Sequence, residues 1–214
     1  MYLPPAFKNE DRESLCAIMK APGLANLVTA TAEGPMVTPL PLLLDEEEGE
    51  FGVLYGHMAK ANAHWRLEPI GEALAIFMGP DAYITPSWYA TKRETGKVVP
   101  TWNYVTVHAQ GPVEFVHDSE RLLQLVTRLT RLHEGSRPEP WEVHDAPADY
   151  IAAQLRGIVG LRMPVTRLEG KMKMSQNRSE ADRHGIAAGL AESDRPTDVL
   201  SARLIPTLSQ RRLN

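Results

Sequence analysis

The sequence predicts a mainly β protein with peripheral helices, built on an antiparallel sheet or barrel. About six extended runs, rich in β-branched and aliphatic residues, are separated by turn signals such as Glu33-Gly34. Helical patterns occur at the rim and between strands, and they do not follow each strand in turn as a parallel sheet requires. The chain has 214 residues, which is enough to bury a core without disulfides or metals.

Before residue 58 the sequence predicts one helix and then a ladder of hairpins. The helix covers 9–21, where apolar residues recur at helical spacing and Asn9 can cap the first turn. Three extended runs follow, at 25–32, 35–45 and 51–57. Pro39 predicts an edge or a bulge in the second run, because proline cannot donate to a sheet ladder. The acidic run 45–50 predicts a solvated hairpin turn, since no basic residue lies among its carboxylates.

The middle of the chain predicts a short helix and two further strands. The helix is expected over 59–70, and the two strands are expected over 72–79 and 104–116. Gly79-Pro80 ends the first of these strands, although residues 81–84 can continue it around a bulge. Gly111-Pro112 interrupts the second strand.

The clearest helix covers 119–134, with Asp118 as its cap. Its apolar stripe consists of Leu122, Leu125, Val126, Leu129 and Leu132. A short helix, a last strand and a final helix are then expected around 147–155, over 157–170 and from Ser179 onward. We expect one domain over 1–193 and a C-terminal tail over 194–214 with little core of its own.

Composition and missing motifs exclude several classes of function. The net charge of -4 argues against a broad nucleic-acid-binding surface. The single Cys16 cannot form an internal disulfide, and the first residues lack the pattern of a signal peptide, so we expect a cytoplasmic protein. No apolar run approaches the roughly 18 residues that a membrane span needs. Dinucleotide, Walker, nucleophile-elbow and zinc spacings are all missing from the sequence.

Residues 56–65 are the first candidate site. A strand end followed by a helix start exposes unpaired backbone N–H groups, which bind anions. With Lys60 and Asn62 beside them, these groups make a workable phosphate site, and His57 can donate to the same anion. The alternative interpretation is a surface helix with a capping histidine.

An aromatic stretch and a basic stretch are the other candidates. Residues 83–104 hold five of the ten Trp and Tyr side chains, which can sandwich a planar ring or pack in a core or an interface. Residues 156–178 carry a net charge of +5, and 175–178 gather a hydroxyl, two amides and a guanidinium. This group suits a phosphate and the polar edge of a heterocycle, or else forms a solvated basic loop. Together, the three stretches are compatible with an antiparallel barrel that holds an anionic, planar ligand.

Six ordered blocks of sequence resemble one known family. The blocks are MYLPPAF, GHMAKANAHW, IFMGPDAYITPSWYATK, GKVVPTWNYVTVHAQG, LTRLHE and LEGKMKMSQNRSEADR. They are similar to the PaiB family, whose members are flavin-binding split-barrel proteins described as negative transcriptional regulators. The similarity runs from Met1 to about Leu190, which is nearly the whole chain.

The resemblance implies an antiparallel, FMN-binding split β-barrel that forms a homodimer with the cofactor near the subunit interface. The residues implied near the FMN phosphate or ribityl chain are His57, Lys60 and Asn62. Those implied near the chain or ring are Trp102, Asn103 and Tyr104. The residues implied to complete the site, from the same subunit or from its partner, are Lys171, Ser175, Gln176, Asn177 and Arg178.

Three functions follow from the resemblance. The first is repression of transcription, directly or through a partner, although no helix-turn-helix is predicted for direct DNA binding. The second is an FMN-dependent oxidoreductase, for which His57, His64 and His108 are candidate bases by residue type alone. The third is a flavin carrier or sensor without catalysis. No metal is expected.

Overall fold

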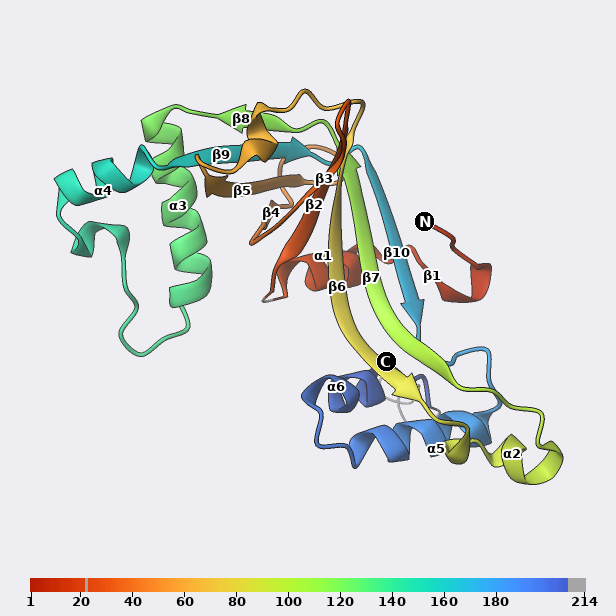
Figure 1. Cartoon of the computed structure of the whole chain (residues 1–214). Coiled ribbons are helices and arrows are strands. Elements are labelled where there is room, and N and C mark those ends of the chain that lie inside the picture. Colours follow the sequence, from red (N-terminus) through yellow and green to blue (C-terminus); the bar gives the residue numbers. More distant parts are fainter. Residues whose placement is uncertain (22, 208–214) are drawn as a thin grey trace. The chain divides into compact units, whose positions relative to one another are not determined.

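The computed structural model describes residues 1–21 and 23–207 of the chain (Figure 1). Within them the chain forms ten strands, six α-helices and four 3-10 helices. These elements divide between two compact units. Unit 1 contains Met1–Ile18, Met78–Val107 and the described residues from Glu169 onward, and unit 2 contains Met19–Phe77 and His108–Leu168.

Unit 1 contains four neighbouring strands in the order β1-β10-β7-β6. Their bounds are Lys8–Asn9 for β1, Arg167–Lys173 for β10, Thr101–Gly111 for β7 and Ala73–Ile84 for β6. Strands β6 and β7 are long enough to contribute residues to both units. The helices that begin in unit 1 are η1 (Pro5–Phe7), α1 (Arg12–Lys20), η3 (Pro86–Trp88), α2 (Ala90–Thr95), α5 (Glu180–Ala191) and α6 (Pro196–Leu204).

The core of unit 1 forms where α5 packs against η3 and α6. Its buried members are Ala82, Ile84, Tyr89, Ile186, Leu190, Ala202 and Ile205. Close approach depends on Gly185 and Gly189, because a Cβ at either position would lie 2.1 or 2.3 Å from Trp88. Ser179 caps α5 by accepting a hydrogen bond from the backbone N–H of Asp182, as a short hydroxyl side chain at this position favours.

Unit 2 contains the strand order β6-β2-β3 and a second sheet with the order β4-β5-β9-β8. Its own elements are β2 (Ala25–Thr31), β3 (Gly34–Leu40), β4 (Leu43–Asp45), β5 (Val53–Ala59), η2 (Ala63–Arg66), β8 (Glu114–Val116), α3 (Ser119–Glu134), η4 (Val143–Asp145), α4 (Ala148–Leu155) and β9 (Ile158–Pro164). The pairs β2–β3, β2–β6, β4–β5, β5–β9 and β8–β9 are all antiparallel, and His57 of β5 lies opposite Gly160 of β9.

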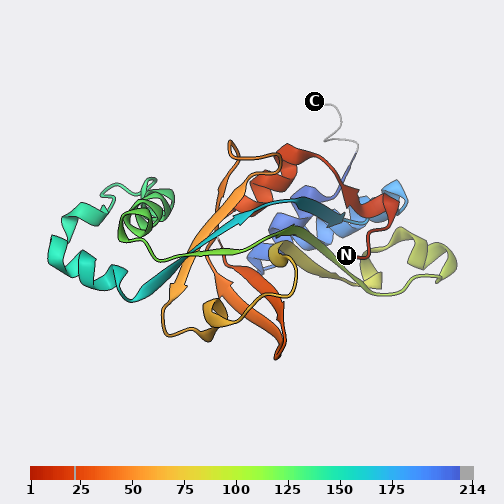
Figure 2. The same ribbon diagram turned by 90° about the horizontal axis from the view of Figure 1, so that it is seen from above.

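Helices α3 and α4 lie side by side in both views of the chain (Figures 1 and 2). Asp118 caps α3 by accepting from the backbone N–H of Arg121, as the sequence predicts. The buried face of the helix presents Leu122, Leu125 and Leu129, and α3 packs on β5 and β9. Among the described residues, none belongs to a helix long and apolar enough to cross a membrane.

The prediction of mainly antiparallel β structure with peripheral helices is confirmed, but several elements differ from their expected bounds. The expected helix over 59–70 is wrong: only Ala63–Arg66 is helical, as a 3-10 turn that Asn62 caps. Of the two alternatives at Gly79-Pro80, the end of the strand is wrong and its continuation over 81–84 is confirmed, because β6 runs to Ile84. A Cβ on Gly79 would lie 3.0 Å from the Cβ of Val105, so glycine permits the close neighbour there.

Two expected strands are each divided in the structure. The run 35–45 forms β3 and β4, which are separated at Pro41 and Leu42, and the run 157–170 forms β9 and the beginning of β10. The cap of α1 also differs, because the helix begins at Arg12 and Asp11 accepts from the backbone N–H of Ser14.

The acidic turn and the predicted tail both make contacts that the sequence does not reveal. In the turn, Glu46 pairs with Lys20, Asp45 pairs with Arg128 at 2.6 Å, and Glu48 pairs with Arg162 at 3.4 Å. These three carboxylates therefore form ion pairs with basic side chains from elsewhere in the chain, and the turn is not solvated by water alone. In the region predicted as a tail, α6 and Ile205 pack into the core of unit 1, and residues 208–214 lie outside the described residues.

Candidate functional site

The loop between β10 and α5 holds part of the predicted site in a fixed backbone conformation. Ser175 has a φ of 59°, in the left-handed region that few residues other than glycine adopt. Gln176 holds this loop with both ends of its amide. Its Oε1 accepts from the backbone N–H of Met174 at 2.7 Å, and its Nε2 donates to the carbonyl of Met172 at 2.5 Å. The amide of Gln176 is therefore occupied in shaping the loop.

A small cavity of about 50 Å³ lies where this loop meets the start of β7. We call it the cationic cavity. It is lined by Phe7, Thr101, Asn103, Lys173, Ser175, Asn177 and Arg178. Four of these residues, Asn103, Ser175, Asn177 and Arg178, belong to the predicted set, so the structure brings them together.

Asn103 is the most informative residue of the cationic cavity. Its side chain is fully buried, and its Oδ1 accepts a hydrogen bond from the hydroxyl of Ser175 at 3.0 Å. Its Nδ2 is buried without a hydrogen-bond partner. A buried donor in that state costs about 1–3 kcal/mol, so an acceptor oxygen from a ligand would be stabilising there.

Two cations, Lys173 and Arg178, line the cationic cavity, and Lys171 lies close enough to Lys173 to affect its pKa. The Nζ of Lys173 donates to the hydroxyl of Thr101 at 2.5 Å and to the carbonyl of Trp102. Burial lowers the pKa of Lys173, and the positive charges of Lys171 and Arg178 lower it further. Burial, the largest cause, and the two neighbouring positive charges all disfavour the charged ammonium, and a nearby anion would favour it.

Aromatic side chains lie around two of the cations. The Nζ of Lys171 donates to the carbonyl of Tyr2 at 3.0 Å and lies 5.3 Å from the ring centroids of both Tyr2 and Tyr104. The guanidinium of Arg178 lies 5.1 Å from the ring centroid of Tyr89. Such cation–π contacts help to hold charged groups in place.

Trp102 presents an exposed aromatic surface in the same unit. Its side chain is 49% exposed, and its ring meets Tyr83 edge to face at a centroid distance of 6.0 Å. The predicted residues Trp102 and Tyr104 are therefore placed on the strand that supplies Thr101 and Asn103 to the cavity.

The other three predicted residues belong to unit 2. The backbone N–H of Lys60 donates to the carbonyl of Gly157 at 2.8 Å, and that of Asn62 donates to the carbonyl of Ala59 at 2.9 Å. The unpaired N–H groups expected of a helix start are therefore bonded. The side chain of Asn62 is also occupied, because its Oδ1 accepts from the backbone of His64 and its Nδ2 donates to Thr38.

His64 and His57 have different surroundings in unit 2. His64 is 1% exposed, and its two ring nitrogens are hydrogen-bonded to Thr29 at 2.8 Å and to Thr38 at 2.7 Å. His57 is half-buried, and its Nδ1 has no hydrogen-bond partner. Burial lowers the pKa of both histidines and favours their neutral forms.

Sequence reasoning missed three residues of the cationic cavity, Phe7, Thr101 and Lys173. Lys173 had a usable signal, because Lys171 and Lys173 alternate along one strand and so point to the same face. Thr101 and Phe7 carried none, since their place in the cavity depends on contacts between distant parts of the chain.

Comparison with known proteins finds a family match and a curated relative. A family model described as "Putative FMN-binding domain" matches residues 1–167. The protein named protease synthase and sporulation protein PAI 2, from Bacillus subtilis, is 30% identical over 206 residues, which cover 96% of each chain.

Two solved structures share the fold at low sequence identity. The flavocytochrome Anf3 from Azotobacter vinelandii has a TM-score of 0.56 and 16% identity, and the match covers 78% of this chain and 69% of that one. The FAD and heme binding protein from Mycobacterium smegmatis has a TM-score of 0.55 and 12% identity, with coverage of 78% and 73%. The fold expected from the sequence, that of flavin-binding split-barrel proteins, is therefore supported by structure as well as by sequence.

Proposed function

The chain belongs to this family of FMN-binding domains, and we propose that the cationic cavity holds the phosphate of its FMN. The observation that carries the proposal is the buried, unpartnered Nδ2 of Asn103 in a cavity that Lys173 and Arg178 line. Phosphate oxygens accept hydrogen bonds and carry negative charge, so they satisfy both features at once. No redox or catalytic step is needed to account for this arrangement.

The donor set of the cavity fits a phosphate. Arg178 and Lys173 supply charge, while Asn103 supplies the donor that lacks a partner. The volume of about 50 Å³ is far below the roughly 300 Å³ at which pockets for whole ligands begin, so only the phosphate end fits inside. The flavin ring would then lie outside the cavity; in the same unit, Trp102 exposes an aromatic surface on β7.

FMN supplies electron transfer at its ring when bound, and the chain supplies binding, orientation and electrostatics. Lys173 has its ammonium fixed by Thr101 and by the carbonyl of Trp102, so its charge is held in place before a ligand arrives. Asn103 is fixed in the same way by Ser175. Such preorganisation reduces the entropy lost on binding.

Titration of FMN into the full chain tests this proposal. We expect flavin fluorescence or absorbance to report saturable binding, and Arg178→Gln to weaken the affinity by about 10- to 100-fold through loss of a charge-assisted contact. Arg93→Gln is the matched control, because Arg93 is an exposed arginine on α2 in the same unit. Equal affinities for R178Q and the unaltered chain would place the phosphate elsewhere.

We also propose that the chain acts as a homodimer in which a second copy covers the flavin. The support is the small volume of the cationic cavity and the exposure of Trp102, which together leave a ring uncovered by unit 1 itself. Sedimentation velocity with and without FMN tests this. We expect a dimer that FMN stabilises; a monomer at every concentration that retains full FMN affinity would contradict it.

The PaiB resemblance supports a negative regulatory role in the cytoplasm, and we propose that the chain exerts it through a partner rather than by reading DNA. Two of the three arginines of α3 are in ion pairs, because Arg128 pairs with Asp45 at 2.6 Å and Arg131 pairs with Glu142 at 3.5 Å. Mobility-shift titrations at several salt concentrations should show no specific complex. A tight, strongly salt-dependent complex would instead support direct binding.

None of the residues that line the cationic cavity is a histidine. The cavity therefore offers the oxidoreductase alternative no histidine as a base. Anaerobic mixing of the FMN-loaded protein with NADH or NADPH measures it directly. Rapid bleaching of the flavin would favour the enzyme, whereas a flavin that stays oxidised favours the regulatory role.

A further inference from the structure

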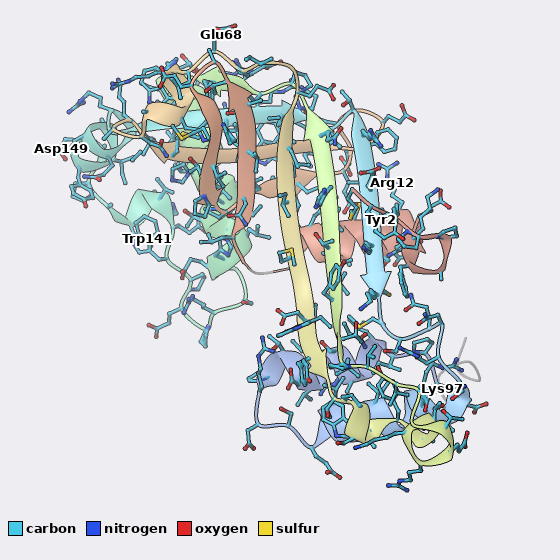
Figure 3. The ribbon with its side chains drawn as sticks, turned by 45° about the vertical axis from the view of Figure 1, so that its right-hand side comes forward. Tyr2, Arg12, Glu68, Lys97, Trp141 and Asp149 are labelled. Carbon is cyan, nitrogen blue, oxygen red and sulfur yellow. The ribbon has the colours of Figure 1, made fainter. Side chains whose placement is uncertain are left out.

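A second pocket lies in unit 2 between α3, α4 and the strands β5 and β9, and it shares no lining residue with the cationic cavity. Its volume is about 380 Å³, within the roughly 300–1,000 Å³ of small-molecule sites. The residues that give it its chemical character are His57, Thr130, Trp141, Tyr150, Gln154 and Ile158. Trp141 is labelled on the connection between α3 and α4 in Figure 3.

The lining of this pocket carries no formal charge. Among the described residues that line it, there is no aspartate, glutamate, lysine or arginine. A phosphate or carboxylate would therefore enter without a counterion, which is costly in a partly desolvated site. An occupant that matches this lining is uncharged.

His57 gives the pocket a polar group without a partner. Its Nδ1 is buried and makes no hydrogen bond among the described residues. Burial lowers the pKa of His57, so the ring is neutral near pH 7 and can either accept or donate at Nδ1. An orphaned buried nitrogen is stabilised by a ligand that supplies one hydrogen bond.

Aromatic groups line the same pocket. Trp141 is 45% exposed and Tyr150 is 56% exposed, so each leaves a large part of an apolar ring open to solvent. Tryptophan and tyrosine bind planar rings by stacking or edge-to-face contact. The apolar space continues into a neighbouring groove of about 630 Å³, which shares Val143, Ile151 and Leu155 with the pocket.

We propose that this pocket binds an uncharged, planar aromatic compound of one or two rings whose polar substituent is hydrogen-bonded by His57. Aromatic side chains at the rim receive the ring, and Thr130 and Gln154 are available to a second polar atom. The ligand class differs from FMN, whose phosphate requires cations. This proposal does not rest on the location of the phosphate site.

The probe for the test is 2-naphthol, which is neutral at pH 7 and carries one hydroxyl on two fused rings. Naphthalene is its matched control, because it has the same rings without the hydroxyl. We expect calorimetric titration of the full, FMN-loaded chain to show saturable binding of 2-naphthol about tenfold tighter than that of naphthalene, which is the size of one good hydrogen bond.

Two variants assign the binding to the pocket. His57→Phe keeps a planar ring and removes the nitrogen, so it should weaken 2-naphthol about tenfold and leave naphthalene unchanged. Thr130→Phe fills the pocket and should weaken both compounds; its melting curve shows whether it has folded. His133→Phe, on the exposed part of the same helix, is the control and should alter neither affinity.

Two results would overturn the proposal. One is equal affinity for 2-naphthol in H57F and in the unaltered chain. The other is a folded T130F variant that binds both compounds as the unaltered chain does. Measuring FMN affinity of H57F separates the two proposals: a loss of FMN binding with unchanged 2-naphthol binding assigns His57 to the flavin and contradicts its role in this pocket.

Discussion

Asn103 illustrates how a residue can lower stability in one state and raise it in another. In the chain without ligand, its buried Nδ2 lacks a partner, and only its Oδ1 is used, by Ser175. An unpaired buried donor costs about 1–3 kcal/mol, which is at least as much as the hydrogen bond to Ser175 contributes. Asn103 therefore lowers the stability of the ligand-free protein, and a ligand that accepts a hydrogen bond from its Nδ2 removes this penalty.

We predict that Asn103→Leu leaves the free energy of unfolding without FMN within about 1 kcal/mol of the unaltered chain, because one lost hydrogen bond is offset by removal of the unpaired donor. The same change should reduce the stabilisation that added FMN confers, since ligand stabilisation scales with affinity. Urea denaturation with and without FMN measures both quantities. A large loss without FMN, together with an intact FMN effect, would show that Asn103 is a structural residue only.

His64 makes stability depend on pH. Burial lowers the pKa of His64, so the unfolded chain binds its proton at a higher pH than the folded chain does. The free energy of unfolding should therefore fall as the pH drops below about 6.5, and the loss should be complete below the folded pKa. Above pH 7 the contribution is fully present.

We predict that His64→Gln flattens this part of the stability profile, because its amide can still bridge Thr29 and Thr38 but does not titrate. Chemical denaturation between pH 5 and 8 provides the measurement. Burial also lowers the pKa of His57, so the free energy of unfolding of H64Q should still depend somewhat on pH. Comparing H57F, H64Q and the double variant separates the contributions of the two histidines. An unaltered slope in H64Q would mean that His64 keeps an ordinary pKa.

Two helices with the same kind of cap allow a matched comparison. Ser179 caps α5 and Asp118 caps α3, and each side chain accepts from a backbone N–H of the first turn. Only the first lies next to the loop that supplies Ser175, Asn177 and Arg178 to the cationic cavity. We therefore expect the caps to contribute similarly to stability and differently to ligand binding.

We predict that Ser179→Ala and Asp118→Ala each lower the free energy of unfolding by about 1 kcal/mol. S179A should in addition weaken FMN several-fold, because the loop that precedes α5 loses its anchor. Thermal or urea denaturation measures the first effect, and flavin titration measures the second. Equal FMN affinity in the two variants would contradict a link between the α5 cap and the cavity.

Elements whose signals are local were predicted well. The helix at 119–134 and the helix after Ser179 have a cap and an apolar stripe within their own sequence, so no distant residue is needed to identify them. The wrong predictions depend on distant partners. The expected helix over 59–70 fails because Asn62 and His64 bond to Thr38 on β3, and β6 continues through Gly79 because Val105 lies close beside it.

The residues of the candidate site also differ in whether a local sequence signal identifies them. Asn103, Ser175, Asn177 and Arg178 were named from the family resemblance, and the structure brings them to one cavity. Periodicity and composition alone identified only three stretches: an anion-binding candidate at 56–65, an aromatic stretch and a basic stretch. Phe7 comes from the other end of the chain, so its place in the cavity does not follow from local pattern. Lys173 had a local signal, its alternation with Lys171 along β10.

The two ends of the described chain both contribute to unit 1, which makes the C-terminal region a test of how the protein is built. Ile205 is fully buried and packs with Ile84, Tyr89 and Leu190. Its residues come from a region that the sequence predicts to be a tail. A tail without core would tolerate truncation of an apolar side chain, whereas a core position would not.

We predict that Ile205→Ala lowers the free energy of unfolding by about 2–4 kcal/mol, because it removes three buried carbons from a packed cluster. Leu200→Ala is the control, since Leu200 lies on α6 with 45% of its side chain exposed and should change stability by less than about 0.5 kcal/mol. Urea denaturation of the two variants distinguishes the cases. If both variants lower the free energy of unfolding only slightly, α6 is an appendage. If I205A lowers it much more than L200A does, residues 196–205 are part of the fold that supports the cationic cavity through α5.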